Sequence, residues 1–305
     1  MKIKVRVPSS TANLGPGFDV FGAALCLYNE FEAEYISNAK KTTFTIKGEG
    51  KKSLDIGKKS LLWQTMQKTF KVLGETKFSL NNLNISINNN IPLSGGLGSS
   101  STAIVGGIIL ANALCKNKLD KSQIADLAVK IEGHPDNVIP AIFGGLCICS
   151  RDEDENHEMV INLPIPKLKV VLCVPAFELR TKHSRQIVPK IFAINDVVFN
   201  MSRVALLTAA FCCADYSLLK QAMQDKLHQP YRGKVIPAMN EVFQAALDAK
   251  AFGVFLSGSG PTLAALCADK NAVNVQKAMK NVWKKENISI KNYILDFDIK
   301  GAITI

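Results

Sequence analysis

Apolar and polar residues alternate with a period of two in the first part of the chain. The first segment sets Ile3, Val5 and Val7 between basic residues, which is the period of a strand with one buried face. Pro8 is expected to end this strand, because proline lacks the N–H that a sheet requires. The strands expected in this part are 2–8, 20–36, 42–48 and 82–89.

A second period, of three to four residues, predicts the helices. In the segment after Ser60 it places Leu62, Met66 and Phe70 on one stripe, and Ser60 is a suitable N-cap. Pro140 limits its segment to a short helical turn at most. The expected helices are 60–72, 121–132, 194–212, 216–223, 238–249 and 271–285, and one more helix is expected after the glycines of the apolar stretch 91–114. The later expected strands are 146–149, 168–174, 252–256, 262–267 and 288–297, and residues 179–189 form an expected polar loop.

These elements alternate without a long series of parallel strands, which favours an α+β fold. A length of 305 residues is sufficient for two domains. The acidic segment 151–158 marks the expected boundary. We therefore predict an N-terminal domain of residues 1–157 and a C-terminal domain of residues 158–305.

Composition narrows the class of protein without naming an activity. Hydrophobic residues make up 47% and charged residues 21%, as in an ordinary globular protein. The net charge of +11 is carried by scattered lysines, so we expect neither a nucleic-acid nor a membrane partner. The segment 91–115 is apolar, but its glycine, serine and asparagine favour a buried helix. Eight cysteines without a C-x-x-C pair, and an alternating N-terminus, predict a reduced cytoplasmic protein.

A glycine- and serine-rich loop opens the longest uncharged stretch of the chain, IPLSGGLGSSSTAIVGGIILANAL at 91–114. Such a loop before a helix gathers free N–H groups and the positive end of the helix dipole, which suits a phosphate. It lacks the lysine of a Walker A loop and the third glycine of a dinucleotide fingerprint. The alternative is a buried glycine-rich helix packed against a sheet. The candidate phosphate-binding residues are Pro92, Gly95, Gly96, Leu97, Gly98, Ser99, Ser100 and Ser101.

Two further sets of residues are candidates for binding. Asn13 and Asp19 lie in a loop between rigid turns, where a ligand could rest, although Asp19 could instead cap the next element. Glu132 could bind Mg²⁺ together with the hydroxyl of Ser100. The alternatives there are an exposed charge at a helix end and a simple helix cap.

Three motifs occur in the order found in the GHMP small-molecule kinases, which the chain resembles over nearly its whole length. They are PSSTANLGPGFD, PLSGGLGSSS and SGSGPT. Within that family, GPGFD, EGHPDN, LRTKHSR and YRGK resemble the homoserine kinases. The resemblance implies an N-terminal domain like domain 2 of ribosomal protein S5 and a ferredoxin-like C-terminal domain. It also implies an ATP-dependent kinase of threonine biosynthesis, acting on L-homoserine.

The resemblance also implies roles for individual residues. Ser100 and Glu132 would hold Mg²⁺ beside the ATP phosphates, and Asp19 would face the ammonium of homoserine. Arg185 and Arg232 would bind its carboxylate, for which the guanidinium group is well shaped. The rest of the expected substrate pocket is Asn13, His134, Asn137 and Thr181. The arginines could instead be surface charges, and His134 could satisfy a turn.

The expected chemistry needs no strong protein base. Mevalonate kinase, which the chain also resembles, has an aspartate where this chain has Asn137, and an amide cannot accept the hydroxyl proton. A loose transition state makes early proton removal unnecessary. Asp136 is the rival base, or else a helix cap. Two alternative functions stay open: a GHMP kinase for another alcohol and a non-catalytic GHMP-fold binding protein. For the assembly of the protein, a homodimer also stays open.

Overall fold

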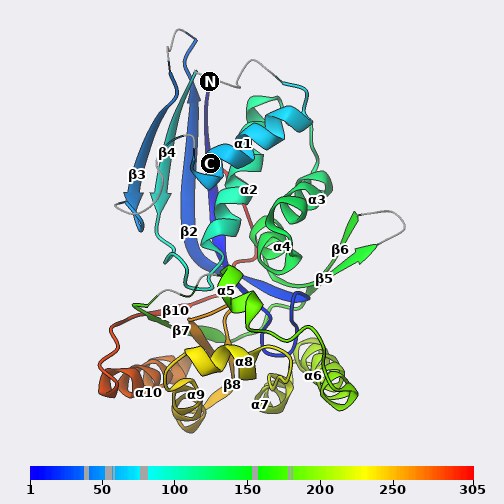
Figure 1. The fold of residues 1–305 in the computed structure, drawn as a ribbon, viewed down its shortest axis with the longest axis vertical. Coiled ribbons are helices and arrows are strands. Elements are labelled where there is room, and N and C mark those ends of the chain that lie inside the picture. Colours follow the sequence, from blue (N-terminus) through cyan, green and yellow to red (C-terminus); the bar gives the residue numbers. More distant parts are fainter. Residues whose placement is uncertain are drawn as a thin grey trace.

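The computed structural model describes two sheets with helices packed on them (Figure 1). The described residues are 1–37, 41–51, 57, 59–75, 82–152, 157–177, 179 and 181–305, without the side chains of residues 181 and 182. No described helix has the length and apolar character needed to cross a membrane. The predicted α+β class is confirmed.

The larger sheet has seven strands among the described residues. They are β1 (Lys2–Ala12), β2 (Phe21–Tyr35), β3 (Thr43–Gly48), β4 (Leu83–Asn89), β5 (Leu146–Asp152), β6 (His157–Leu163) and β11 (Ile303–Thr304). The order is β11-β1-β2-β4-β3, with β5 pairing with both β2 and β6. All pairs are antiparallel except β3 with β4. The predicted strands of this half are confirmed, and β6 was not predicted.

The first strand does not end at Pro8, so that expectation is wrong. β1 continues to Ala12, and its pairing with β2 shifts register between Pro8 and Ser9. A bulge tolerates proline because the local hydrogen-bond ladder is already interrupted there. The continuation carries Ser10 into the interior beside the glycine-rich loop, where its N–H donates to the carbonyl of Leu97 at 3.2 Å.

Four helices cover one face of this sheet (Figure 1). They are α1 (Leu61–Val72), α2 (Ser99–Leu114), α3 (Lys121–Glu132) and α4 (Pro135–Phe143). Ser60 caps α1 as predicted, accepting the N–H of Trp63 at 3.3 Å. Helix α2 is buried around most of its circumference. A Cβ at Gly106 would lie 2.4 Å from the Phe31 ring, so the small residue lets this helix pack closely on β2.

Helix α4 contains Pro140, which contradicts the prediction of a short turn. An interior proline cannot donate to the carbonyl four positions earlier, here that of Asp136, and its ring crowds the same carbonyl. The carbonyl of Asp136 lies against β2: a Cβ at Gly22 would stand 1.9 Å from its oxygen. This close approach holds the start of α4 on the sheet, and the start of α4 carries several of the candidate site residues.

The smaller sheet is antiparallel and has the strand order of a ferredoxin-like fold. Its strands are β7 (Lys169–Pro175), β8 (Ala251–Leu256), β9 (Leu263–Cys267) and β10 (Ile290–Leu295), in the order β10-β7-β9-β8. The helices around it are α6 (Ile194–Cys212), α7 (Leu219–Ala222), α8 (Gln229–Arg232), α9 (Met239–Asp248) and α10 (Ala272–Lys285), joined by short 3-10 turns at Tyr216–Leu218, Gly233–Val235 and Asp269–Asn271. The core of this half includes Trp283 and Phe255, both fully buried.

A short helix, α5 (Thr181–Gln186), lies where the two halves meet (Figure 1). The predicted polar loop at 179–189 is therefore partly wrong, because a helix of six residues carries no long apolar stripe to reveal it. A single apolar cluster that includes Phe21, Leu97 and Leu172 joins the two halves.

The division into residues 1–157 and 158–305 stays a prediction. The boundary falls at the first residue of β6, and β11 pairs with β1 in the larger sheet.

All eight cysteines are free, as expected. Burial raises the pKa of Cys147 and of Cys173 to about 12 each, which keeps these thiols protonated. Cys212 and Cys213, at the end of α6, are exposed.

Replacing Gly22 with alanine should destabilise the protein by roughly 2 kcal/mol or more, because neither backbone can yield without moving α4. Gly74→Ala is the matched control. Its Cβ would enter open space, and its φ of 67° carries only the strain of a left-handed residue, about 1 kcal/mol. Urea unfolding of both variants measures the difference, and equal losses would contradict the close-packing argument.

Candidate active site

A cavity of about 800 Å³ lies between the two halves and collects most of the predicted site residues. The predicted residues that line it are Asn13, Asp19, Gly95, Gly96, Gly98, Ser99, Ser100, Ser101, Glu132, His134, Asn137, Arg185 and Arg232. Pro92 and Leu97 are buried and are not among the lining residues. The side chain of Thr181 lies outside the described residues.

The glycine-rich loop turns sharply before α2. Ser94, Gly96 and Gly98 all have positive φ, and Gly98 is the N-cap without a side-chain hydrogen bond. The N–H groups of the first helical turn therefore have no partner within the helix. Since Ser99, Ser100 and Ser101 line the cavity, the positive end of α2 faces the same space. This is the geometry that an anion-binding helix start requires.

The glycines of this loop are required by the packing of the protein itself. A Cβ at Gly96 would lie 2.2 Å from the carbonyl oxygen of Ser257, and one at Gly98 would lie 2.1 Å from Oγ of Ser10. Ser257 also donates its hydroxyl to the carbonyl of Gly96 at 2.7 Å. The SGSGPT turn is thus packed against the loop.

Glu132, the last residue of α3, reaches the start of α2. Its Oε1 accepts the hydroxyl of Ser101 at 2.7 Å and lies at 3.4 Å from Oγ of Ser100. The expected partner, Ser100, is present, but Ser101 makes the shorter contact and was not predicted for it. The side chain of Glu132 is only 11% exposed, so it is not a surface charge at a helix end.

The surroundings of Glu132 fit a divalent cation. Among the described residues, no lysine or arginine lies within salt-bridge distance of this carboxylate. The nearest positively chargeable atom found is Nε2 of His134 at 3.9 Å. A carboxylate with hydroxyl neighbours and little solvent offers the hard oxygen ligands that Mg²⁺ prefers.

A chain of hydrogen bonds fixes the first turn of α4. Ser10 donates to Oδ1 of Asn137 at 2.9 Å, and Nδ2 of Asn137 donates to Oδ1 of Asp136 at 3.2 Å. The same carboxylate oxygen pairs with Nδ1 of His134 at 2.6 Å. Asp136 is 2% exposed and makes no capping bond to the helix, so the capping alternative is wrong.

His134 lies between two carboxylates. Its burial alone would lower the pKa of the imidazole, but the hydrogen bond to Asp136 and the charges of Asp136 and Glu132 outweigh burial and raise that pKa above its usual value. His134 does make the local contact that the turn alternative requires, because its Nδ1 is hydrogen-bonded to Asp136, two residues ahead. Nε2 points toward Glu132.

Asp19 and Arg185 form a bidentate pair. Nη1 and Nη2 of Arg185 donate to the two carboxylate oxygens at 2.9 and 2.6 Å. The pairing and the charges of Asp136 and Glu132 raise the pKa of Arg185 against the opposing effect of burial. Asp19 does not cap the next element through its side chain, and both groups line the cavity.

Asn13 ties two loops together. Its Nδ2 donates to the carbonyl of Gly258 at 2.9 Å, and its Oδ1 accepts the N–H of Asp19 at 3.1 Å. The residue is 2% exposed and has a φ of 71°, a conformation that asparagine tolerates better than most residues. Its amide therefore positions Asp19 at the edge of the cavity.

Arg232 is a buried cation, with 1% of its surface exposed. Nε donates to the carbonyl of Ser184 at 3.3 Å, and Nη1 donates to the carbonyl of Gly258 at 3.0 Å. Burial and the nearby charge of Arg185 lower its pKa to about 10, so it stays charged at neutral pH. Both arginines lie over the ring of Phe18, with Cζ at 5.6 Å for Arg185 and 5.2 Å for Arg232. The surface-charge alternative is wrong for Arg232.

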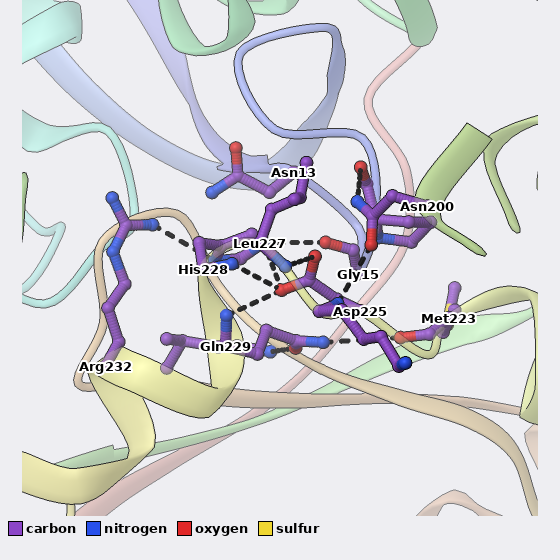
Figure 2. A network of polar contacts seen from close by, with 12 residues as sticks. Asn13, Gly15, Asn200, Met223, Asp225, Leu227, His228, Gln229 and Arg232 are labelled. Atoms are coloured by element: carbon purple, nitrogen blue, oxygen red, sulfur yellow. Dashed lines mark hydrogen bonds and ion pairs between the residues drawn. The ribbon is translucent and has the colours of Figure 1, made fainter. Parts of the chain in front are cut away.

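Sequence reasoning missed the polar network beneath Arg232 (Figure 2). Asp225 accepts the N–H groups of Leu227, His228 and Gln229 at 2.9, 2.9 and 2.6 Å. His228 is completely buried and contacts both Gly15 and Arg232. One feature of the sequence could have indicated this network. An aspartate shortly before a short helix that begins with proline often binds the N–H groups at the start of that helix.

In the ligand-free protein, Asp136→Asn should lower the pKa of His134, because the substitution removes the main stabilising charge while burial remains. Glu132→Gln should lower it by less, since Glu132 makes no hydrogen bond to the ring. The stabilisation by charged His134 is present at acidic pH and is lost as the pH rises through its folded pKa. NMR titration of the His134 imidazole measures this pKa in the parent protein and in the two variants. A larger shift in the Glu132 variant would contradict the assignment of Asp136 as the main partner.

Known proteins match this chain over nearly its whole length, and family models match two parts of it. Residues 60–145 match the family model "GHMP kinases N terminal domain", and residues 207–285 match "GHMP kinases C terminal". Homoserine kinase from Carboxydothermus hydrogenoformans is 42% identical over 301 residues, covering 99% of this chain and 96% of the relative. Homoserine kinase from Desulfitobacterium hafniense is 39% identical over 303 residues, covering 99% and 100%.

Solved structures give the same result. The crystal structure of homoserine kinase from Cytophaga hutchinsonii matches with a TM-score of 0.88 at 31% identity, and the match covers 100% of this chain and 97% of that chain. The matched relatives are aligned over nearly their full lengths, so no large part of either protein is left out of the similarity. The chain therefore belongs to the GHMP kinase family, among its homoserine kinases.

Proposed function

We propose that the protein transfers the γ-phosphoryl group of ATP to the side-chain hydroxyl of L-homoserine, giving O-phospho-L-homoserine. One observation carries the proposal: a single cavity joins a helix start suited to phosphates with a carboxylate and two arginines suited to an amino acid. These two ends are what the transfer needs, an anion cradle and a held acceptor.

At one end, the N–H groups of the loop and of the first turn of α2 would bind the ATP phosphates. Glu132 and the hydroxyl of Ser100 would hold Mg²⁺, and the contact with Ser101 would orient the carboxylate. A bound Mg²⁺ supplies positive charge against the phosphate oxygens and helps fix the direction of transfer.

At the other end, Asp19, Arg185 and Arg232 carry one negative and two positive charges. A zwitterionic amino acid complements them, because its ammonium can bind Asp19 and its carboxylate can bind the guanidinium groups. The Asp19–Arg185 pair would then exchange part of its mutual contact for contacts with substrate. Mevalonate has no ammonium to offer Asp19, so this set of charges favours homoserine.

The transfer would proceed without a strong protein base. The hydroxyl oxygen of homoserine forms a bond to the γ-phosphorus while the bond from that phosphorus to the bridging oxygen of ATP breaks. Asn137 cannot take the hydroxyl proton, and its amide is already held by Ser10 and Asp136. In a loose transition state the proton leaves late, to a phosphoryl oxygen. Positioning and charge stabilisation would account for most of the rate.

A substrate panel tests the acceptor. Mg²⁺-dependent ADP release should be at least about a hundredfold more efficient with L-homoserine than with L-serine, L-threonine or mevalonate, because only homoserine combines the zwitterion with the right hydroxyl reach. Comparable rates for mevalonate would replace the acceptor assignment with another GHMP kinase activity. No ADP release with any alcohol would favour a non-catalytic binding protein.

The role of Asp136 separates the two mechanisms. The base-free mechanism predicts that Asp136→Asn keeps kcat within about tenfold of the parent, since an essential general base is worth roughly 10²–10⁴. Circular dichroism and urea unfolding check that the variant is folded. A loss of several orders of magnitude in kcat with intact folding would assign the proton to Asp136.

A further inference from the structure

A buried histidine connects two parts of the amino-acid end of the cavity. His228, the N-cap of α8, is 0% exposed. Nε2 lies 2.7 Å from the carbonyl oxygen of Gly15, and Nδ1 lies 3.2 Å from Nη1 of Arg232 (Figure 2). Gly15 belongs to the loop that carries Asp19. No step of the proposed transfer uses His228 directly.

These two contacts determine the protonation of the ring. A carbonyl oxygen only accepts hydrogen bonds, so Nε2 must carry the hydrogen. A guanidinium only donates, so Nδ1 must present its lone pair to Arg232. His228 is therefore neutral, with its proton on Nε2. A second proton on Nδ1 would remove the acceptor and place a cation against Arg232.

The groups facing the ring agree with a neutral state. Burial is the largest effect on the imidazole and lowers its pKa, and the charge of Arg232 acts in the same direction. Asp225 and Asp19 oppose them, but the nearest carboxylate oxygen of Asp225 is 3.5 Å away and already accepts two backbone N–H groups. The ring of Phe18 lies 5.3 Å from the imidazole, centre to centre.

Arg232 has one end fixed and one end available. Nε and Nη1 are bound to the carbonyls of Ser184 and Gly258 and to His228. No hydrogen bond from Nη2 to a described residue is found, and the side chain lines the cavity. His228 is the only side chain among these three acceptors. It adds a third point of attachment and so helps to fix the direction of the guanidinium.

We propose that His228 is a positioning residue for the amino-acid substrate, which aims Arg232 into the cavity through Nδ1 and fixes the Asp19 loop through Nε2. This rests on the proposed function, in which Arg232 binds the substrate carboxylate. Asp225 supports the arrangement by holding the backbone at 227–229, and so the place from which the imidazole projects.

Two substitutions separate the two ends of the ring. The amide oxygen of asparagine can replace Nδ1, so His228→Asn retains an acceptor for Arg232. The amide nitrogen of glutamine can replace Nε2, so His228→Gln retains the donor to Gly15 and loses the acceptor. We expect His228→Gln to raise KM for homoserine about tenfold, the effect of one hydrogen bond to a charged group, and His228→Asn to raise it about threefold or less. KM for ATP should stay within about twofold in both, because His228 contacts Gly15, Asp225, Arg232 and the ring of Phe18, none of which belongs to the glycine-rich loop. The value of kcat should change less than KM for homoserine.

Equal effects of the two variants on both substrates would overturn the proposal in favour of a packing role, as would no effect in either. Arg232→Lys distinguishes this failure from failure of the proposed function. If Arg232→Lys raises KM for homoserine while the His228 variants do nothing, only the positioning role is lost. If Arg232→Lys leaves KM unchanged, the carboxylate site itself is wrongly assigned.

A second measurement does not depend on the folding of any variant. Imidazole ¹⁵N NMR of the intact protein should show His228 with Nδ1 unprotonated and Nε2 protonated at neutral pH. A signal with Nδ1 protonated at neutral pH would overturn the proposal.

Discussion

The whole arrangement depends on how closely the glycine-rich loop can approach its neighbours. Gly96 lies against the carbonyl of Ser257, and Gly98 lies against Ser10, at distances where no Cβ could fit. These contacts join a loop of the first half both to the strand beneath it and to a turn of the second half. The cavity forms because the two halves meet there, and neither sheet alone would enclose it.

Charge is distributed unevenly along this cavity, and the distribution separates two binding tasks. Glu132 sits near the positive start of α2 without a lysine or arginine partner among the described residues, so a bound cation can satisfy it. Asp19 at the other end is already paired with Arg185. His134 lies between the two regions and bonds to Asp136. A metal and an amino acid would thus be held by different carboxylates, which keeps the substrate ammonium away from the metal.

The strands and most helices could be predicted from periodicity, and the glycine-rich loop, Asp19 and Glu132 from their own chemistry. Arg185, Arg232 and His134 were expected in the site only through the resemblance to the GHMP kinases. The errors occur where tertiary structure overrides a local rule. Pro8 lies at a bulge and Pro140 loses a single bond inside a helix, so neither proline ends its element. The helix at 181–186 is too short to show a period. The partnership of Asp225 with Arg232 through His228 joins residues whose spacing matches no binding motif, so only the folded chain reveals it.

The hydrogen-bond capacity of each side chain divides the cavity residues into two groups. The amides of Asn13 and Asn137 have both their oxygen and their nitrogen bound to other parts of the protein. These amides fix the geometry of the cavity, and they lose few of their protein hydrogen bonds when a ligand binds. Nη2 of Arg232 donates no hydrogen bond to a residue that the structure describes, and Ser100 makes a long contact with Glu132. A transfer that relies on positioning needs both kinds, because rigid amides hold in place the few groups that must exchange protein contacts for substrate.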